Sequence, residues 1–409
     1  MKIIGDFHIH GPYAQACSRN TTLRLLEDNA RIKGLDILGT GDCLHPKWFK
    51  EITSQLTEDQ KGILWSKTKF PFIWQTEISL MYSYKGKGRR IHYVLLFPNR
   101  DAVSQVIDVL LKRGRLDYDG RPIFGINSIE FVDMMHSVSG DIEIIPAHAW
   151  TSWMSIFGSK SGFDSVEECF DERSKKIHAI ETGMSSNPYM NRRVSNLDKY
   201  NLVSFSDCHT YFPWRLGREA TIFDCDINYK SILKAIRTSE GLNGTIEVNP
   251  EYGKYHLDGH RNCDVVLEPS ESKKLKGICP KCKNPLTIGV AYRIEQLADR
   301  KEPKNVPYFV SLIPLSELIA SVYGIKQLHG KKVWEIYNQL IKRFDNELNV
   351  LLNAGFNELS EVINRKLVDV ILKNREGKLK INPGYDGVYG GVVLGKDEKI
   401  ISQKNLSEF

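Results

Sequence analysis

The most informative stretch of the chain is Lys2-Ile3-Ile4-Gly5-Asp6-Phe7-His8-Ile9-His10, an apolar run that ends in two histidines. Short apolar runs rich in β-branched residues are typical of buried strands. Alternate side chains of an extended strand share a face, so His8 and His10 would point to the same side. Two imidazoles on one face can bind one metal ion. The stretch therefore predicts a buried strand with a metal site at its end.

Six further apolar runs follow, separated by segments with a helical pattern such as 22–33 and 102–112. The runs cover residues 35–39, 70–74, 91–97, 142–145, 177–180 and 202–205. Strands that alternate with helices indicate β/α units with parallel strands. Seven such strands favour a barrel of the TIM kind over a short open sheet, so the predicted class is α/β.

Each of the seven predicted strands contains or leads into a histidine or a carboxylate. The carboxyl ends of the strands of a β/α barrel meet on one rim, where active sites are built. Mixed imidazole and carboxylate ligands suit Zn, Mn or Fe rather than Mg alone. We therefore expect two or three divalent ions (Zn, Mn, Mg or Fe) on that rim. The candidate metal ligands are His8, His10, Asp42, Glu77, His92, His148, Asp207 and His209.

These ligands stand in ordered motifs that resemble the PHP superfamily (polymerase and histidinol phosphatase). The motifs are His8-x-His10, Gly41-Asp42, Glu77, His92, His148 and Asp207-x-His209, and the resemblance spans residues 1 to about 225. It implies a distorted, TIM-like (β/α)7 PHP barrel with a phosphoesterase site of two or three metal ions.

The same resemblance distributes the ligands among three ions. It implies that His8, His10, Glu77 and Asp207 hold one ion, and that Glu77 bridges to a second ion bound by His92 and His148. Asp42 and His209 would serve a third ion. The sequence departs from many relatives here, because residues 13–17 contain no histidine and Asp42 stands where those relatives have His. His45 could assist the third ion or lie at the surface, and Glu181 could orient a ligand or be a strand-end charge.

A second group of metal ligands lies between residues 260 and 282. His260-x-x-Cys263 is followed, after a loop, by Cys279-Pro280-Lys281-Cys282. Two close pairs separated by a loop predict a tetrahedral structural zinc that leaves no position open for chemistry. His256 is the competing fourth ligand. Lysines crowd the loop, namely Lys273, Lys274, Lys276, Lys281 and Lys283, and favour contact with a phosphate backbone.

The whole chain, rather than its barrel alone, resembles the endonuclease Q family. The matching segments are 150–157, 161–165, 168–170, 181–188, 217–220 and 383–387, together with the cysteine cluster. The resemblance implies a DNA repair endonuclease that uses several metal ions to cut 5′ of uracil, hypoxanthine, xanthine and abasic sites. Glu77, His148 and Asp207 would then be catalytic. The alternative is a small-molecule phosphatase like histidinol phosphatase, which leaves the basic C-terminal part without a purpose.

Damaged DNA is thus the expected partner, a replication or repair clamp is a candidate partner, and a monomer is favoured.

We consider four arginines as phosphate contacts or as ordinary surface salt bridges, and four aromatic residues as base-stacking or structural residues. The arginines are Arg192, Arg193, Arg215 and Arg218, with Lys281 and Lys283 as further phosphate candidates. The aromatic residues are Trp150, Trp153, Tyr189 and Trp214.

Length and composition indicate a globular chain of two or three units. Of 409 residues 41% are hydrophobic and 26% are charged, which argues against a largely disordered chain. Residues 1–249 carry 31 basic and 30 acidic groups and residues 250–409 carry 25 and 20, so +5 of the net +6 lies in the second part. No apolar run reaches the length of a transmembrane helix. Eight cysteines without a disulfide pattern favour a reduced, cytoplasmic protein.

We predict three units from these patterns. Residues 1–228 would form the metal-dependent barrel, residues 229–293 a linker and the zinc-binding unit, and residues 294–409 a mainly helical domain in contact with DNA. The segment 333–352 has the clearest amphipathic helical pattern.

Overall fold

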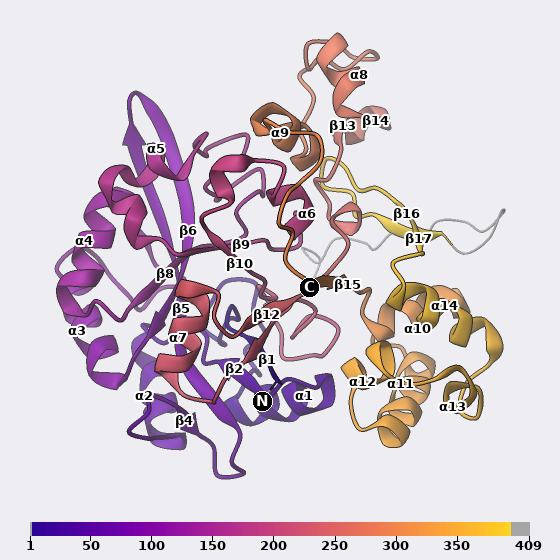
Figure 1. Cartoon of the computed structure of the whole chain (residues 1–409), viewed down its shortest axis with the longest axis horizontal. Helices are drawn as coiled ribbons and strands as arrows, with labels where there is room; N and C mark the ends of the chain where they lie inside the picture. The colour runs from indigo at the N-terminus through magenta and orange to yellow at the C-terminus, as the bar shows by residue number, and fades with distance from the viewer. Residues whose placement is uncertain (1, 394–409) are drawn as a thin grey trace.

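A computed structural model describes residues 2–393 of the chain. All seven predicted strands are present, as β1 (Lys2–Asp6), β2 (Ile37–Gly39), β5 (Pro71–Tyr84), β6 (Lys87–Phe97), β8 (Glu143–Pro146), β9 (Ala179–Glu181) and β10 (Asn201–Val203). They follow one another around the part of the molecule that Figure 1 colours indigo to magenta.

The seven strands form a closed succession. β1 pairs with β2, β2 with β5, β5 with β6, and β6 with β8. After β8, the amide of Ala149 donates to the carbonyl of Glu181 at the end of β9, which pairs in parallel with β10. A parallel bridge between Ile9 and Cys208 brings the chain after β10 back beside the end of β1. The ends of β1 and β10, which carry predicted ligands, therefore lie together.

The expectation of seven parallel strands is wrong for β6. This strand is antiparallel to both of its neighbours, β5 and β8. Only Lys85 and Gly86 separate β5 from β6, and both have positive φ angles, 49° and 74°. A two-residue turn with two positive φ angles makes a tight hairpin, which can join only antiparallel strands.

Helices and short elements fill the connections of this part of the chain. They are α1 (Leu23–Lys33), α2 (Pro46–Gln55), β3 (Thr57–Glu58), β4 (Leu64–Trp65), α3 (Arg100–Leu111), β7 (Ile123–Phe124), α4 (Ser128–Val138), α5 (Val166–Phe170), η1 (Asp171–Lys176), α6 (Pro188–Asn191) and η2 (Ser195–Leu197). The helices expected over 22–33 and 102–112 correspond to α1 and α3. The Thr22 side chain caps α1 by accepting from the amide of Leu25, and Gly34 ends the helix with a φ of 100°.

The sheet continues beyond residue 228, the predicted end of the barrel. β11 (Ala220–Asp224) pairs with β1, and β12 (Leu242–Glu247) pairs with β11 after α7 (Tyr229–Thr238). β15 (Phe309–Ser311) then adds to β12 in parallel. Residues from all three predicted units thus share one sheet, and the boundaries at 228 and 293 stay predictions.

The remaining elements form a small projecting unit and a group of helices (Figure 1). The first comprises η3 (Pro250–Tyr252), β13 (Asp258–His260), η4 (Arg261–Cys263), β14 (Val265–Leu267), α8 (Pro269–Lys274) and α9 (Val290–Leu297). The second comprises α10 (Leu315–Tyr323), α11 (Lys331–Phe344), α12 (Glu347–Leu352), α13 (Phe356–Ser360), α14 (Arg365–Arg375), β16 (Lys380–Asn382) and β17 (Gly391–Val393). Residues 394–409 of the predicted helical domain lie outside the described residues.

The single helix expected over 333–352 is two helices, α11 and α12. Asp345 between them has a φ of 69°, which an α-helix does not allow. The side chain of Asn346 then caps α12 by accepting from the amide of Asn349. Among the described residues, none of the helices combines the length and the apolar character needed to cross a membrane.

A buried ion pair connects the barrel to the C-terminal helices. Lys33 of α1 lies 2.8 Å from Glu347 of α12, measured from Nζ to Oε1, and both side chains are at most 1% exposed. Glu347 also accepts hydrogen bonds from the Leu315 amide and the Tyr337 hydroxyl. Its charge is therefore fully enclosed between the two parts.

Replacing one partner of this pair should destabilise the protein strongly. We expect Lys33→Met to lower the free energy of unfolding by about 3–5 kcal/mol, because it leaves the Glu347 carboxylate buried without a counter-charge. The double variant Lys33→Met/Glu347→Gln should recover part of that loss. Arg24→Met, which breaks an exposed ion pair with Asp28 on the same helix, should cost no more than about 1 kcal/mol. Urea denaturation that ranks the two single variants equally would contradict the assignment.

Candidate functional site

The first group of candidate ligands gathers at the ends of β1 and β10. His8 and His10 follow β1 and are buried. The Nε2 atom of His10 lies 3.2 Å from oxygens of both Glu77 and Asp207, and Nε2 of His8 lies 3.5 Å from both carboxylates. One donor atom from each of the four residues lies within 4.8 Å of the others. The structure thus brings together the four residues that the resemblance assigned to one ion.

A second group shares Glu77 with the first. Glu77 stands in the middle of β5, His92 on the neighbouring β6, and His148 directly after β8. The Glu77 Oε1 atom lies 2.7 Å from Nδ1 of His92 and 3.2 Å from Nε2 of His148. All three residues are buried, and their donor atoms again lie within 4.8 Å of one another. The shared carboxylate is suitably placed to bridge two ions.

The chemistry of these donors fits divalent cations. Nε2 of His8 is buried and has no hydrogen-bond partner among the described residues, as expected of a nitrogen that a metal would take. Burial opposes the charge on Glu77, yet His92, Arg121 and His8 hold the pKa of this carboxyl well below its usual range. The pKa of Asp207 is likewise lowered, because His8, His10 and His209 outweigh its burial. Two ionised carboxylates among imidazoles suggest metal sites, although they do not identify the metal.

Two further carboxylates orient the histidines of the first group. Glu181 lies 2.9 Å from Nδ1 of His8 and also accepts from the backbone amide of His148. Asp42 lies 2.9 Å from Nδ1 of His10 and accepts from the amide of Gly11. A carboxylate on Nδ1 fixes the tautomer and aims Nε2 at the metal position. Glu181 thus lies where a ligand-orienting residue is expected.

The residues predicted for a third ion do not form a third group. Both oxygens of Asp42 are engaged, one by His10 and one by the Gly11 amide. His209 packs against the ring of His10, with centroids 4.4 Å apart, and its Nδ1 lies 3.1 Å from the Asp207 carbonyl. His45 stacks on Tyr13 instead. Within residues 2–393, only the two groups sharing Glu77 gather in the barrel.

One charged residue of this site, Arg121, is not among the residues predicted from the sequence. Its Nη1 atom lies 3.1 Å from Oε2 of Glu77, and its side chain is 25% exposed. Arg121 belongs to the irregular segment between α3 and β7, where no periodic pattern or motif marks it. Only the folded chain brings this segment to the ligands, so no signal in the sequence identified it.

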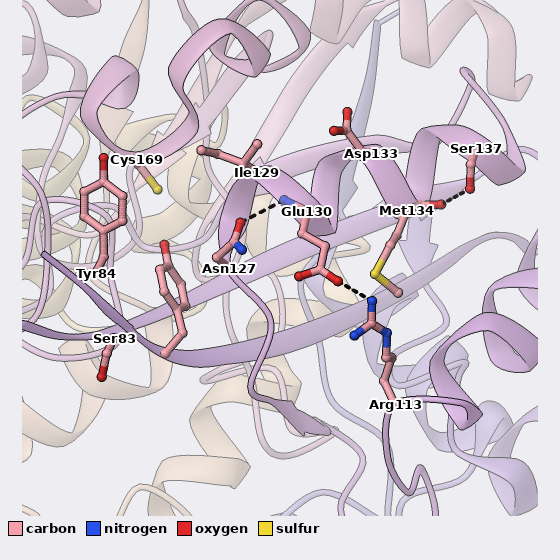
Figure 2. A pocket seen from close by; sticks show the side chains of 11 residues that line it. Ser83, Tyr84, Arg113, Asn127, Ile129, Glu130, Asp133, Met134, Ser137 and Cys169 are labelled. Atoms are coloured by element: carbon pink, nitrogen blue, oxygen red, sulfur yellow. Dashed lines mark hydrogen bonds and ion pairs between the residues drawn. The ribbon is translucent and has the colours of Figure 1, made fainter.

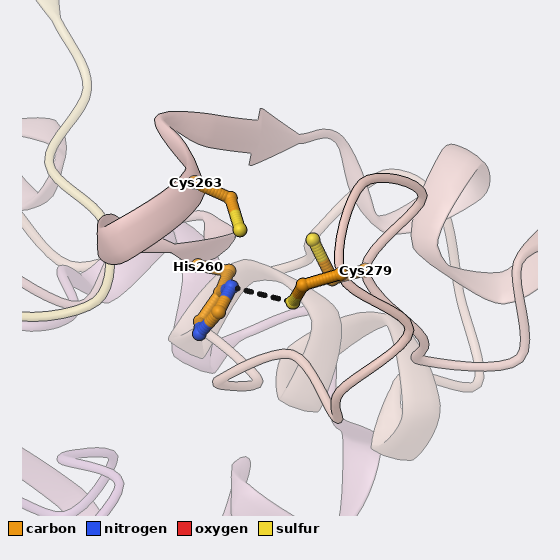
Figure 3. A group of neighbouring side chains, drawn as sticks. His260, Cys263 and Cys279 are labelled. Carbon is orange, nitrogen blue, oxygen red and sulfur yellow. Dashed lines mark hydrogen bonds between the residues drawn. The ribbon is translucent and has the colours of Figure 1, made fainter.

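A third group, His260, Cys263, Cys279 and Cys282, lies in the small projecting unit. Figure 3 shows His260, Cys263 and Cys279 pointing toward one another, and Nδ1 of His260 lies 3.2 Å from Sγ of Cys282. Burial would raise the pKa of Cys279, but backbone amides of Cys282 and Lys281 help to lower it to about 6. The group suggests a tetrahedral metal site with a Cys3His donor set. His256, the competing ligand, does not belong to the group.

The six candidate phosphate contacts divide into enclosed and accessible residues. Arg192 is buried and donates to the carbonyls of Leu197 and Tyr200, and buried Arg215 lies 2.6 Å from Glu317. These two guanidinium groups are therefore not open to a phosphate.

The other two arginines are half-buried and also engaged, Arg193 with Glu295 and Arg218 with the Ser206 carbonyl. Lys281 and Lys283 are exposed, as are Lys273, Lys274 and Lys276.

The aromatic candidates divide in the same way. Trp150 is buried and donates to Asn191, and Trp214 stacks on Phe212. Trp153 and Tyr189 are 46% and 42% exposed. The Trp153 carbonyl accepts from Thr151, whose hydroxyl lies 3.2 Å from Nδ1 of His148. The ring of Trp153 is therefore accessible, and its backbone carbonyl is connected to the second group through Thr151.

A cavity of about 700 Å³ lies away from all three groups. It is lined by Tyr82 and Tyr84 of β5 and by residues of α4, including Met134, and Arg113 and Glu130 form an ion pair at its side (Figure 2). None of its lining residues is a candidate ligand.

The chain is similar to known proteins in both sequence and structure. Residues 314–378 match the family model of the MJ0043 C-terminal domain. Protein MJ0043 of Methanocaldococcus jannaschii is 34% identical over 300 residues, which are 71% of this chain and 36% of that protein. Protein YqxK of Bacillus subtilis is 28% identical over 96% of this chain and 99% of its own length. This chain thus spans about a third of the archaeal protein and nearly all of the bacterial one.

Two solved structures cover essentially the whole chain. One is the lesion-specific endonuclease PfuEndoQ from Pyrococcus furiosus, with a TM-score of 0.86, 31% identity, and coverage of 96% of this chain and 95% of that one. The other is endonuclease Q in complex with a 27-mer duplex substrate with an abasic lesion at the active site. It has a TM-score of 0.86, 30% identity and full coverage of both chains.

Proposed function

Since the chain belongs to the endonuclease Q family, we propose that it is a lesion-specific endonuclease that acts on damaged DNA. It would hydrolyse the phosphodiester bond on the 5′ side of deaminated bases (uracil, hypoxanthine and xanthine) and of abasic sites. The observation that carries the proposal is the pair of buried ligand groups that share Glu77, in a chain that matches the family over its full length. The expected products are 3′-hydroxyl and 5′-phosphate ends.

The barrel is proposed to be of the PHP type. Its support is the closed succession of seven strands, with candidate ligands on β5 and β6 and shortly after β1, β8 and β10. His8, His10, Glu77 and Asp207 would hold one divalent ion, and Glu77, His92 and His148 a second. Such ions activate a water and neutralise charge on the phosphate.

The surrounding residues would keep the site rigid and expose the lesion. Glu181 and Asp42 fix the orientation of His8 and His10, so the ligands are preorganised before DNA arrives. Cutting beside a damaged base requires access to that base, which is commonly gained by flipping the nucleotide out of the duplex. The ring of Trp153 is exposed and its backbone carbonyl is connected to His148 through Thr151, so this ring is a candidate to stack on a base.

The Cys3His group is proposed to hold one structural zinc. Its four donors match the number that a tetrahedral zinc requires, and the amides of Lys281 and Cys282 near the Cys279 sulfur favour the thiolate form that zinc binds. The exposed lysines beside it would contact the DNA backbone. Lys281 and Lys283 donate to carbonyls of the same unit, and neither forms an ion pair with an acidic residue among the described residues.

The central test is incubation of metal-loaded protein with duplexes that carry uracil, hypoxanthine, xanthine or an abasic site. We expect a single nick 5′ of each lesion. Asp207→Asn should lower the rate at least about 100-fold, because loss of an outer-shell partner alone costs 10–100-fold. The exposed Asp226→Asn serves as the matched control. Rapid hydrolysis of p-nitrophenyl phosphate with no nicking of any lesion would instead support the small-molecule phosphatase.

Removal of the cysteine ligands should remove one zinc ion and leave the barrel ions in place. We expect Cys279→Ser and Cys282→Ser to lower the zinc content by about one equivalent per chain, measured by elemental analysis, because three donors hold zinc poorly. Cys225→Ser, at a half-buried cysteine outside the group, is the control. Unchanged zinc content in both ligand variants would refute the site.

Neutralising the lysines of the projecting unit should weaken DNA binding and its salt dependence. For Lys273→Gln/Lys274→Gln/Lys276→Gln, the negative slope of log affinity against log salt concentration should become shallower. The change should be about 0.9 for each DNA phosphate that the variant no longer neutralises. Fluorescence anisotropy with a labelled duplex measures both quantities. The control is Lys61→Gln/Lys67→Gln/Lys69→Gln, three exposed lysines next to β4 on the opposite side of Figure 1. Equal effects of the two triple variants would show that only net charge matters.

A further inference from the structure

The segment that carries Arg121 is fixed firmly against the site. Asp119 accepts hydrogen bonds from the amides of Gln15 and Arg121, which joins this segment to the loop after β1. The Gly120 amide donates to the Tyr13 carbonyl, and a Cβ on Gly120 would stand 2.3 Å from Oδ2 of Asp42. On the other side, the Pro122 carbonyl accepts from Ser79 of β5. The backbone of Arg121 is thus held from both directions.

The guanidinium of Arg121 is only partly used inside the protein. Nη1 binds Glu77, and the described residues provide no other acceptor for the group. A quarter of the side chain is exposed, whereas Glu77 below it is fully buried. An arginine has five N–H donors, so several remain free to bind an anion that enters the site. The arrangement presents a positive charge at the mouth of the ligand cluster.

This charge lies close to Asp42, one of the two residues that the family resemblance assigns to a third ion. Asp42 is committed to His10 and to the Gly11 amide, and residues 13–17 offer no histidine. Arg121 directly follows Gly120, which lies against Asp42, and its guanidinium binds Glu77. An arginine side chain keeps its charge at any ordinary pH. A permanent cation therefore already occupies this region.

We propose that Arg121 is a catalytic residue that binds a non-bridging oxygen of the scissile phosphate and supplies the positive charge assigned by the sequence to a third metal ion. The inference rests on the proposed function, because it requires a phosphodiester in the site. During hydrolysis the oxygen of water bonds to phosphorus, the bond from phosphorus to the leaving oxygen breaks, and the proton of water passes to that oxygen. Negative charge builds on the non-bridging oxygens, which a guanidinium binds well.

The alternative is that Arg121 only balances the charge of Glu77 and so positions a metal ligand. The two roles differ in what changes when the guanidinium is removed. Removing a positioning residue would lower the amount of bound metal. Removing a phosphate-binding residue would leave the bound metal unchanged but alter how sulfur substitution of a phosphate oxygen affects the cleavage rate.

The experiment compares wild type with Arg121→Ala and Arg121→Lys under single-turnover conditions. The substrates are an abasic-site duplex and its two phosphorothioate diastereomers at the scissile position. We expect Arg121→Ala to lower the rate about 10²–10³-fold, the typical effect of losing one preorganised donor. Its barrel metal content should equal that of wild type. Wild type should cleave one diastereomer more slowly than the other, and Mn²⁺ should not restore the rate on the slower one. The Arg121→Ala variant should cleave the two diastereomers at similar rates.

Two controls keep the test decisive. Arg115→Ala removes an exposed arginine of the same segment, paired with the neighbouring Asp117, and should leave the rate within about twofold of wild type, as expected of a surface substitution. Added guanidinium ion at low concentration should restore part of the Arg121→Ala rate, and Arg121→Lys, which keeps the charge, should fall between wild type and Arg121→Ala. A drop in barrel metal content, unchanged diastereomer discrimination, or a rate close to wild type would overturn the inference.

A substrate without DNA separates this inference from the proposed function. If wild type hydrolyses bis(p-nitrophenyl) phosphate but nicks no lesion, the proposed function is wrong while the role of Arg121 can still be measured on that diester. A 10²–10³-fold loss in Arg121→Ala with its metal retained would then support the inference, and an unchanged rate would overturn it.

Discussion

The enclosed charge of Glu77 is the constraint on which the site and the strands around it depend. A carboxylate without water is costly unless cations or hydrogen-bond donors compensate it. Here the compensation comes from histidines on three separate segments and from Arg121, which together hold the pKa of Glu77 low. Glu77 stands in β5, which pairs with β2, β4, β6 and β7. The closed succession of strands thus brings the compensating groups to one buried carboxylate.

Two other buried carboxylates of the barrel, Glu247 and Glu219, have pKa values that shift in the opposite direction from those of Glu77 and Asp207. Glu247 of β12 is fully buried, and burial raises its pKa to about 8 although three hydroxyl groups donate to it. Burial and the neighbouring Glu247 also raise the pKa of Glu219 well above its usual range. Burial thus disfavours charge on Glu247 and Glu219, whereas neighbouring cationic groups lower the pKa of Glu77 and Asp207, the two carboxylates of the ligand groups.

The sequence predicted those parts of the structure that rest on local patterns. The seven apolar runs and the Cys3His spacing follow from strand periodicity and short motifs, and they are found in the fold together with six of the eight candidate barrel ligands, which gather in two groups. The direction of β6 depended on a two-residue turn at Lys85 and Gly86, which an apolar run does not reveal. Arg121 depended on tertiary packing of an irregular segment. Arg192 and Arg215 looked like surface charges, because their carbonyl and carboxylate partners lie elsewhere in the chain.

One loop connects the barrel site to the basic projecting unit. Residues 150–163 follow His148, and the carbonyl of Met154 in this loop accepts from the amide of His92. The same loop binds the projecting unit, since Ser152 donates to the Ile288 carbonyl and Arg293 of α9 donates to the carbonyls of Phe157 and Phe163. A duplex held by the lysines of that unit would therefore lie in a fixed relation to the ligands. Under the proposed function the barrel would bind the scissile phosphate and the connected unit would hold other parts of the duplex, which is consistent with +5 of the net charge of +6 lying in residues 250–409.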